Sequence, residues 1–277
     1  MVRNSGGGAV LEGRRLVFSA GGRTIVGGDG GVHLAFPPGS VTALAGPNGS
    51  GKSTLLRLLA RLIEPSSGEV LLDGADARRL GRRSFARRVA LLPQTPEIPS
   101  GATVWDLVGF GRNPHRGLFD GFSAEDRSAM AWAVDATGLP GHRDRTVETL
   151  SGGERQRAWI AMALAQRTDV LLLDEPTTYL DMRHQVEVLE LLRGLNRRLR
   201  LTLAWVLHDL NQAAAYSDRM VLLKDGRIHA EGAPGEVVTP GRVAAVFGLD
   251  TVMVPHPVTG MPMCLPSWSA PGASGAP

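Results

Sequence analysis

A glycine-rich segment with one lysine has the residue types and spacing of a phosphate-binding loop. It matches the pattern G-x-x-x-x-G-K-[ST] over Gly46, Pro47, Asn48, Gly49, Ser50, Gly51, Lys52, Ser53 and Thr54. Glycines let successive backbone N–H groups turn inward around phosphate oxygens. Lys52 is one of two lysines among 30 basic residues, and its compact ammonium group suits the β- and γ-phosphates better than a planar guanidinium. We expect the loop to bind a nucleoside triphosphate, with the Ser53 hydroxyl as a ligand of Mg²⁺.

Two adjacent carboxylates, Asp174 and Glu175, end a continuous apolar run that predicts a buried strand. Open α/β sheets bind ligands beyond the carboxyl ends of their strands. Asp174 would hold Mg²⁺, directly or through water, and Glu175 would polarise a water for in-line attack on the γ-phosphate. A strand that ends in solvated acids is the ordinary alternative, which the upstream phosphate loop disfavours. His208 ends another apolar run and should lie at the same edge as Lys52 and Asp174.

A second candidate anion site is formed by Ser151, Gly152, Gly153 and Glu154, just before an apolar helical run. A small hydroxyl, two glycines and the free N–H groups of a helix start can together bind an anion. One chain with one nucleotide has no obvious use for two γ-phosphate sites, so we infer that this segment acts on the nucleotide of another copy. A purely structural helix cap is the common alternative for such a motif.

The elements that must position these residues alternate between strands and helices, which predicts an α/β core with a mostly parallel sheet. Strands are expected at Val32–Phe36, Val41–Ala45, 68–73, Val89–Leu92, 169–174, 202–207 and in a hairpin of 220–224 with 227–231. A helix follows the phosphate loop, with Leu55 to Leu62 on one face, and another covers 182–200. Residues 100–168 predict an inserted helical subdomain. One domain should span 14–265, between flexible ends at 1–13 and 266–277.

Composition narrows the class of protein. The 277 residues are 43% hydrophobic and 21% charged, which is ordinary for a soluble globular protein. The sequence contains no run of about 18 uncharged apolar residues that would span a membrane. A single cysteine, Cys264, excludes internal disulfides and is compatible with a reducing cytoplasm. The net charge of +3 is mild, and the excess of arginine over lysine indicates genome composition rather than nucleic-acid binding.

The motifs, in this order and spacing, resemble the nucleotide-binding subunits of ABC transporters. The resemblance spans about residues 16 to 239 and rests on 46–54, Gln94, 150–157, 171–176, Asp181 and His208. It implies a P-loop NTPase core with an N-terminal antiparallel β part, and ATP and Mg²⁺ as cofactors. It also implies a head-to-tail homodimer, in which Ser151, Gly152 and Gly153 of one copy close over ATP held by Lys52 of the other.

The same resemblance assigns roles to three further residues. Gln94 would sense Mg²⁺ and the attacking water and couple the site to a transmembrane partner. Asp181 would lie at the dimer interface, and His208 would contact the γ-phosphate. The family often places an adenine-stacking aromatic residue about 25 residues before the lysine. Here that region is Gly21-Gly22-Arg23-Thr24, so Arg23 could stack through its guanidinium plane instead.

Other segments narrow the resemblance to the iron-siderophore importers: 111–115, 150–162, 208–214 and 256–262. That branch implies a separate integral-membrane permease, an extracytoplasmic siderophore-binding protein and a peripheral place on the cytoplasmic face of the inner membrane. It also handles haem and cobalamin, so the cargo stays open. A soluble ABC ATPase of cofactor assembly is the other alternative.

Two features outside these motifs admit competing interpretations. The arginines between Arg78 and Arg88 could contact acidic lipid headgroups or a permease loop, although charge runs are more often solvated helix faces. Met261, Met263 and Cys264 could hold a soft metal, although such side chains more often pack.

Overall fold

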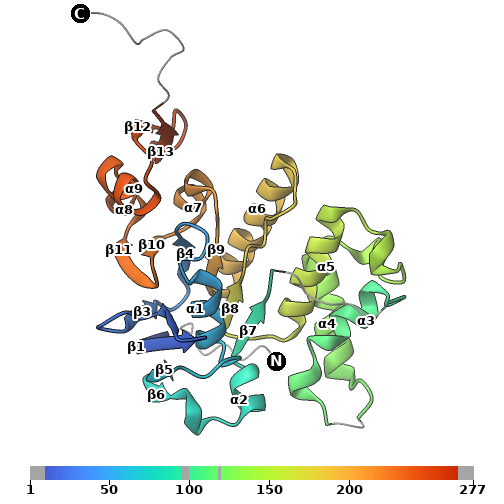
Figure 1. Ribbon diagram of the computed structural model, residues 1–277. Helices are drawn as coiled ribbons and strands as arrows, with labels where there is room; N and C mark the ends of the chain where they lie inside the picture. Colours follow the sequence, from blue (N-terminus) through green and yellow to red (C-terminus); the bar gives the residue numbers. More distant parts are fainter. Residues whose placement is uncertain (1–9, 95–99, 118–119, 268–277) are drawn as a thin grey trace, which may run out of the picture.

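A six-stranded sheet, in the order β11-β10-β4-β9-β8-β7, forms the centre of the molecule in the computed structural model, which describes residues 10–94, 100–117 and 120–267 (Figure 1). The strands are β4 (Val41–Ala45), β7 (Val89–Leu92), β8 (Val170–Leu173), β9 (Thr202–Val206), β10 (Arg219–Lys224) and β11 (Arg227–Gly232). All neighbours are parallel except the hairpin β10–β11. Every residue of β4, β8 and β9 is buried, because helices and a second sheet cover both faces.

The second sheet is antiparallel and lies beside the first. It contains β1 (Leu11–Ala20), β2 (Arg23–Val26), β3 (Val32–Phe36), β5 (Ser67–Leu72) and β6 (Ala75–Asp76). Helix α1 (Lys52–Leu59) buries Leu55, Leu56, Leu58 and Leu59 in the apolar cluster that joins the two sheets. Leu62 was expected on the same face, but it follows the end of the helix and is 66% exposed. The predicted N-terminal antiparallel part is confirmed.

The predicted helical subdomain contains α3 (Val104–Phe110), α4 (Ala124–Ala136) and α5 (Gly152–Ala165). These helices pack on one another beyond β7, on the opposite side from β10 and β11 (Figure 1). Each begins with a capping box, from Thr103, Ser123 and Ser151 respectively. Such boxes satisfy the free N–H groups of a first turn, which explains why three helices begin at these hydroxyl residues.

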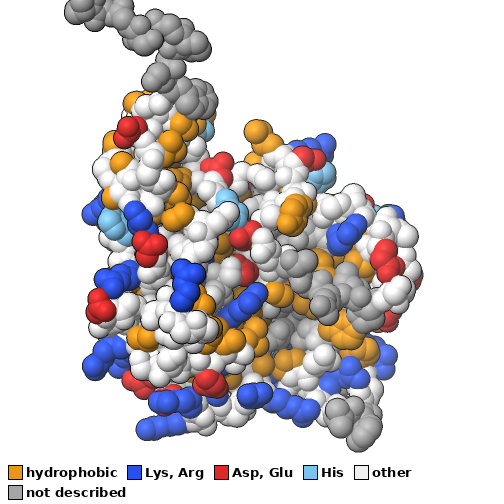
Figure 2. Space-filling model, in the orientation of Figure 1, with side chains coloured by type: hydrophobic (Ala, Val, Ile, Leu, Met, Phe, Trp, Pro, Cys, Tyr) orange, Lys and Arg blue, Asp and Glu red, His pale blue; other side chains and the backbone are white. Residues whose placement is uncertain are grey.

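The remaining helices are α2 (Arg82–Ala86), α6 (Met182–Leu199), α7 (Leu210–Tyr216), α8 (Pro234–Val237) and α9 (Pro240–Phe247). Single 3₁₀ turns occupy η1 (Ala77–Arg79), η2 (Asn113–His115), η3 (Pro140–His142) and η4 (Val147–Thr149). The arginine-rich stretch is therefore not one helix face but two short pieces, η1 and α2. Arg78, Arg79, Arg82 and Arg83 in these pieces are exposed. Helix α2 lies at the lower edge of Figure 1, and Figure 2 shows basic side chains gathered along that edge.

The C-terminal part contains a hairpin that the sequence did not predict, of β12 (Thr251–Pro255) and β13 (Pro262–Pro266). Asn211 at the start of α7 holds it, since its side chain donates to the carbonyl of Cys264 at 3.2 Å and accepts from that residue's N–H at 2.7 Å. The ends expected to be flexible fall mostly outside the described residues, but β1 already begins at Leu11 and β13 includes Pro266. Within the described ranges, no helix has the length and apolar character needed to cross a membrane.

Candidate nucleotide-binding site

The phosphate loop connects β4 to α1, and its backbone path requires glycine. At Gly46, which has φ 153°, a Cβ would lie 2.1 Å from the carbonyl oxygen of Leu223 on β10. At Gly51, which has φ 96°, a Cβ would lie 2.8 Å from the carbonyl oxygen of Ile25. Gly51 is also the N-cap of α1 and supplies no side-chain cap. The first N–H groups of α1 are therefore available to an anion.

Lys52 is folded back over the loop. It is 4% exposed, and its Nζ donates to the carbonyl oxygens of Gly46 and Pro47, both at 2.9 Å. Burial lowers the pKa of its ammonium group, although Glu175 and Asp174 act in the opposite direction. Ser50 Oγ is buried and has no hydrogen-bond partner within the described residues. A buried ammonium beside an unpaired hydroxyl and free helix N–H groups fits the phosphates of a nucleotide.

Ser53 and Asp174 are brought together as the sequence predicts. Ser53 Oγ donates to Asp174 Oδ1 at 2.8 Å, and Asp174 is 3% exposed. Burial raises the pKa of the Asp174 carboxyl. Mg²⁺ binds oxygen ligands octahedrally at about 2.0–2.1 Å, so neighbouring ligands lie about 3 Å apart. The pair therefore fits adjacent positions around Mg²⁺, while Gln94, the third expected ligand, is paired elsewhere.

Glu175 is the centre of a polar cluster at the end of β8. His208 Nε2 lies 2.8 Å from Glu175 Oε1, and Thr178 Oγ1 donates to Oε2 at 2.9 Å. Gln94 Nε2 also donates to Oε2. Glu175 has φ 55°, a left-handed backbone conformation that few non-glycine residues adopt. The three predicted catalytic side chains thus converge, and sequence reasoning missed Thr178, whose only signal was a hydroxyl three residues after the acid.

Glu175, Gln94 and His208 line a cavity of about 470 Å³ together with part of the phosphate loop, a volume ordinary for a small-molecule site. The lining residues are Ile25, Asn48, Gly49, Gly51, Lys52, Ser53, Thr54, Gln94, Glu175 and His208. Arg23, expected to stack on a base, is exposed and is not among them. Side chains alternate along a strand, so Arg23 shares a face of β2 with Ile25 but lies about 7 Å nearer the hairpin turn. The apolar Ile25, and not Arg23, lines the cavity.

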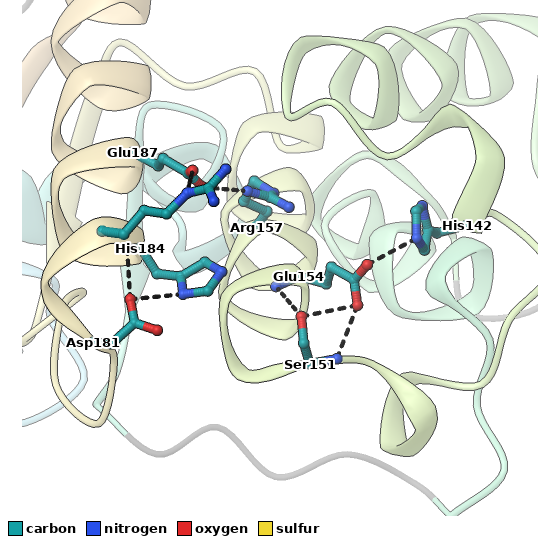
Figure 3. Close-up of polar contacts among 8 residues, drawn as sticks. His142, Ser151, Glu154, Arg157, Asp181, His184 and Glu187 are labelled. Atoms are coloured by element: carbon teal, nitrogen blue, oxygen red, sulfur yellow. Dashed lines mark hydrogen bonds and ion pairs between the residues drawn. The ribbon is translucent and has the colours of Figure 1, made fainter.

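The second candidate anion site, Ser151 to Glu154, which we call the signature segment, lies elsewhere in the same chain. Ser151 caps α5: its N–H and Oγ both donate to Glu154 Oε2 at 2.9 Å, and its Oγ accepts from Glu154 N at 3.3 Å. Glu154 Oε1 is 2.9 Å from His142 Nε2 (Figure 3). None of Ser151, Gly152, Gly153 and Glu154 lines the cavity.

Asp181 begins α6, and its Oδ1 accepts from the backbone N–H of His184 at 2.9 Å. Its side chain is 66% exposed and also lies outside the cavity lining.

Cys264, considered above as a possible ligand of a soft metal, is buried, and burial raises the pKa of its thiol. In the described part of the chain, no group of three or more His, Cys, Asp or Glu side chains is placed to hold a metal ion.

Comparison with known proteins identifies the family of this chain. A family model described as ABC transporter matches residues 30–178. The chain belongs to the ABC transporter family. It is 47% identical to the iron(3+)-hydroxamate import ATP-binding protein FhuC of Bacillus subtilis, over 84% of this chain and 87% of that protein. It is 46% identical to the ferric enterobactin transport ATP-binding protein FepC of Escherichia coli, over 93% and 94%.

The ABC cassette fold has a counterpart among solved structures. A metal-chelate type ABC transporter in an inward-facing conformation matches with a TM-score of 0.81 and 27% identity, over 94% of this chain and 98% of that chain. The predicted α/β fold, with its antiparallel part and helical subdomain, is confirmed. So is the resemblance to the ATP-binding subunits of the iron-siderophore branch. Membership of this ABC family implies that the chain binds ATP.

Proposed function

We propose that this ABC ATPase powers the uptake of ferric siderophores through a separate permease. The observation that carries the proposal is the convergence of Lys52, the Ser53–Asp174 pair and the Glu175 cluster on one cavity. Those groups have the types and positions needed to bind and hydrolyse ATP. The cargo class comes from the relatives, whose names give an iron(3+)-hydroxamate and ferric enterobactin.

The phosphates of ATP would lie on the loop between Gly46 and Lys52, with the Lys52 ammonium turned from the Gly46 and Pro47 carbonyls toward the β- and γ-phosphates. Ser53 and Asp174 would hold Mg²⁺, which supplies positive charge to the β- and γ-phosphate oxygens. Gln94 would join them at this ion by exchanging its present bond to Glu175. Ile25, in place of Arg23, offers an apolar surface next to the loop for the remainder of the nucleotide.

Glu175 would act on the attacking water. Its carboxylate accepts the water's proton as the oxygen attacks the γ-phosphorus, the bond to the β-phosphate oxygen breaks, and ADP and phosphate result. Thr178 and His208 hold this carboxylate in one orientation, which lowers the cost of aligning the water. His208 is 46% exposed at its side chain, so it can also reach a γ-phosphate.

The active form would be a homodimer with two composite sites. Ser151, Gly152 and Asp181 are exposed residues at helix starts and lie outside the cavity of their own chain, so each can serve the nucleotide of the partner copy. Permease subunits would join this dimer at the cytoplasmic face of the cell membrane, with Gln94 as one point of coupling. An extracytoplasmic siderophore-binding protein would deliver the cargo, and no nucleic acid takes part.

The Glu175→Gln variant tests both levels of this proposal. Purified, it should bind Mg-ATP yet hydrolyse it at least about a hundredfold more slowly than wild type, the usual range for a lost acid–base group. The exposed Glu231 provides the matched control, because Glu231→Gln should keep wild-type turnover. A Glu175→Gln protein with near wild-type turnover would sink the catalytic assignment.

Transport is then measured in a deletion strain that carries either allele. The wild-type gene should restore uptake of radiolabelled ferric siderophores, and the Glu175→Gln allele should not. If the deletion abolishes uptake of cobalamin or haem while every siderophore still enters, the cargo class is wrong and the ATPase assignment stands. If purified wild-type protein hydrolyses ATP but the deletion affects none of these cargoes, a soluble role in cofactor assembly replaces import.

A further inference from the structure

The starts of α5 and α6 are held side by side by one histidine (Figure 3). Ser151 caps α5 and Asp181 caps α6, so both segments expected to serve the partner's nucleotide are helix N-termini. His184, in the first turn of α6, contacts both of them.

On one side, His184 fixes Asp181. Its Nδ1 lies 2.8 Å from Asp181 Oδ1, the oxygen that also accepts the His184 backbone N–H. Because a carboxylate can only accept, Nδ1 must carry the proton in this bond. Both of these bonds go to Oδ1, and the Asp181 side chain is 66% exposed. One carboxylate oxygen is thus anchored while the other is presented outward.

On the other side, the His184 ring packs against α5 where that helix has no side chain. A Cβ at Gly153 would lie 2.3 Å from His184 Cδ2 and 3.1 Å from its Nε2. Gly153 itself is buried, with no positive φ to explain the glycine. A side chain at this position would therefore force the His184 ring to move away from α5.

One helical turn further along, a second contact holds the two helices in the same register. Arg157 on α5 lies 3.1 Å from Glu187 on α6, and Glu187 also pairs with Arg183 at 2.9 Å. Residues three or four apart share a helix face. Gly153 therefore faces His184, and Arg157 faces Glu187 one turn further along the same interface. A shift of α5 relative to α6 would have to break both.

We propose that His184 is a positioning residue for ATP hydrolysis. It holds Asp181 and the start of α5 in a fixed relative position, so that the two move as one rigid unit. This inference rests on the proposed function, because the unit acts on the nucleotide of the partner copy. Two groups that stabilise one transition state must both be in the correct position at the same time. A misplacement of about 1 Å can lower the reaction rate about a hundredfold. His184 sets their relative position by hydrogen-bonding one and packing against the other.

The first test separates positioning from stability. His184→Ala should lower kcat at least about tenfold, while the affinity of the isolated subunit for a fluorescent ATP analogue stays within about twofold of wild type. His184→Asn keeps a donor near the position of Nδ1 and should recover part of the lost kcat, whereas His184→Leu, which has no donor, should not. The exposed His33 is the control, and His33→Ala should match wild type.

The second test uses the contact with Gly153. Gly153→Ala should lower the melting temperature, because its Cβ meets the ring, and adding His184→Ala should restore it. No recovery in the double variant would overturn the contact. Equal kcat for wild type and His184→Ala would overturn the positioning role alone, as would a loss that His184→Leu recovers as well as His184→Asn. A wild-type protein without ATPase activity would overturn the proposed function instead.

Discussion

At the scale of single residues, the site depends on places where backbone segments approach too closely for a side chain. Gly46 is the clearest, because a Cβ there would meet the carbonyl oxygen of Leu223 at 2.1 Å, a backbone atom that cannot swing away. The glycine thus allows β10 to pack against the start of the phosphate loop. The loop conformation and the neighbouring strand are determined together.

Gly46→Ala should therefore damage both stability and nucleotide binding. We expect a loss of about 1–3 kcal/mol in the free energy of unfolding, the range for a backbone forced from its conformation, together with weaker ATP binding. Chemical denaturation and nucleotide titration measure the two effects. The control is Gly81→Ala, since Gly81 has no atom within 4 Å of a built Cβ and no positive φ, and surface changes of this kind stay within about 0.5 kcal/mol. Equal unfolding of the Gly46→Ala variant and wild type would contradict the requirement.

At the scale of elements, the helical subdomain is organised around a buried ion pair. Arg112 follows α3, and its Nε lies 2.8 Å from Asp126 Oδ1 on α4; its Nη1 donates to the carbonyl oxygen of Ala165 at the end of α5, also at 2.8 Å. The two side chains are 2% and 6% exposed. Burial raises the pKa of Asp126, but hydrogen bonds from Ser123 and Arg112 outweigh it and lower the pKa to about 2.

Removal of one partner leaves a buried charge, so Arg112→Ala should cost about 3–5 kcal/mol in the free energy of unfolding. Arg127→Ala, at an exposed site on α4, should change this free energy by less than about 0.5 kcal/mol.

Because the Asp126 pKa is lower in the folded chain, its carboxylate stabilises the fold above about pH 4. That contribution, about 2 kcal/mol, is lost as the pH falls toward 2. The stability gap between wild type and Asp126→Asn should narrow over this interval in urea titrations, and a gap independent of pH would contradict the linkage.

At the scale of the whole molecule, the cavity lining contains Lys52, Glu175 and His208 but neither Ser151 nor Asp181. If each composite site combines motifs from two copies, two substitutions in different motifs can both fall in the same site of a mixed dimer. The other site of that dimer then carries neither substitution. A subunit with Lys52→Ala and one with Ser151→Arg would form one site with both defects and one with neither.

Each variant alone should be inactive, and a mixture of the two should recover part of the ATPase activity. Ser151→Arg should still bind ATP as an isolated subunit, because Ser151 does not line its own cavity. Turnover is measured against mixing ratio and compared with mixtures of either variant with itself. A mixture that stays inactive while both proteins are folded would contradict shared sites.

The chemistry of the site was readable in the sequence wherever it depends on contiguous residues. A glycine-rich loop between a strand and a helix, two acids at a strand end and a hydroxyl with an acid three residues later each specify their own local backbone. The apolar runs of β4, β8 and β9 likewise follow from burial on both faces of a parallel sheet. These features required no knowledge of what packs against them.

Tertiary structure alone decided which distant side chains meet. It placed Ile25 rather than Arg23 at the cavity, because the two share a strand face and only the path of β2 over the loop tells which is inner. It also set the His184 ring against Gly153 and paired Arg112 with Asp126. These contacts join residues that lie on different elements of the chain. Their geometry follows from the way one element packs on another. The periodicity of apolar residues along the sequence does not specify that packing.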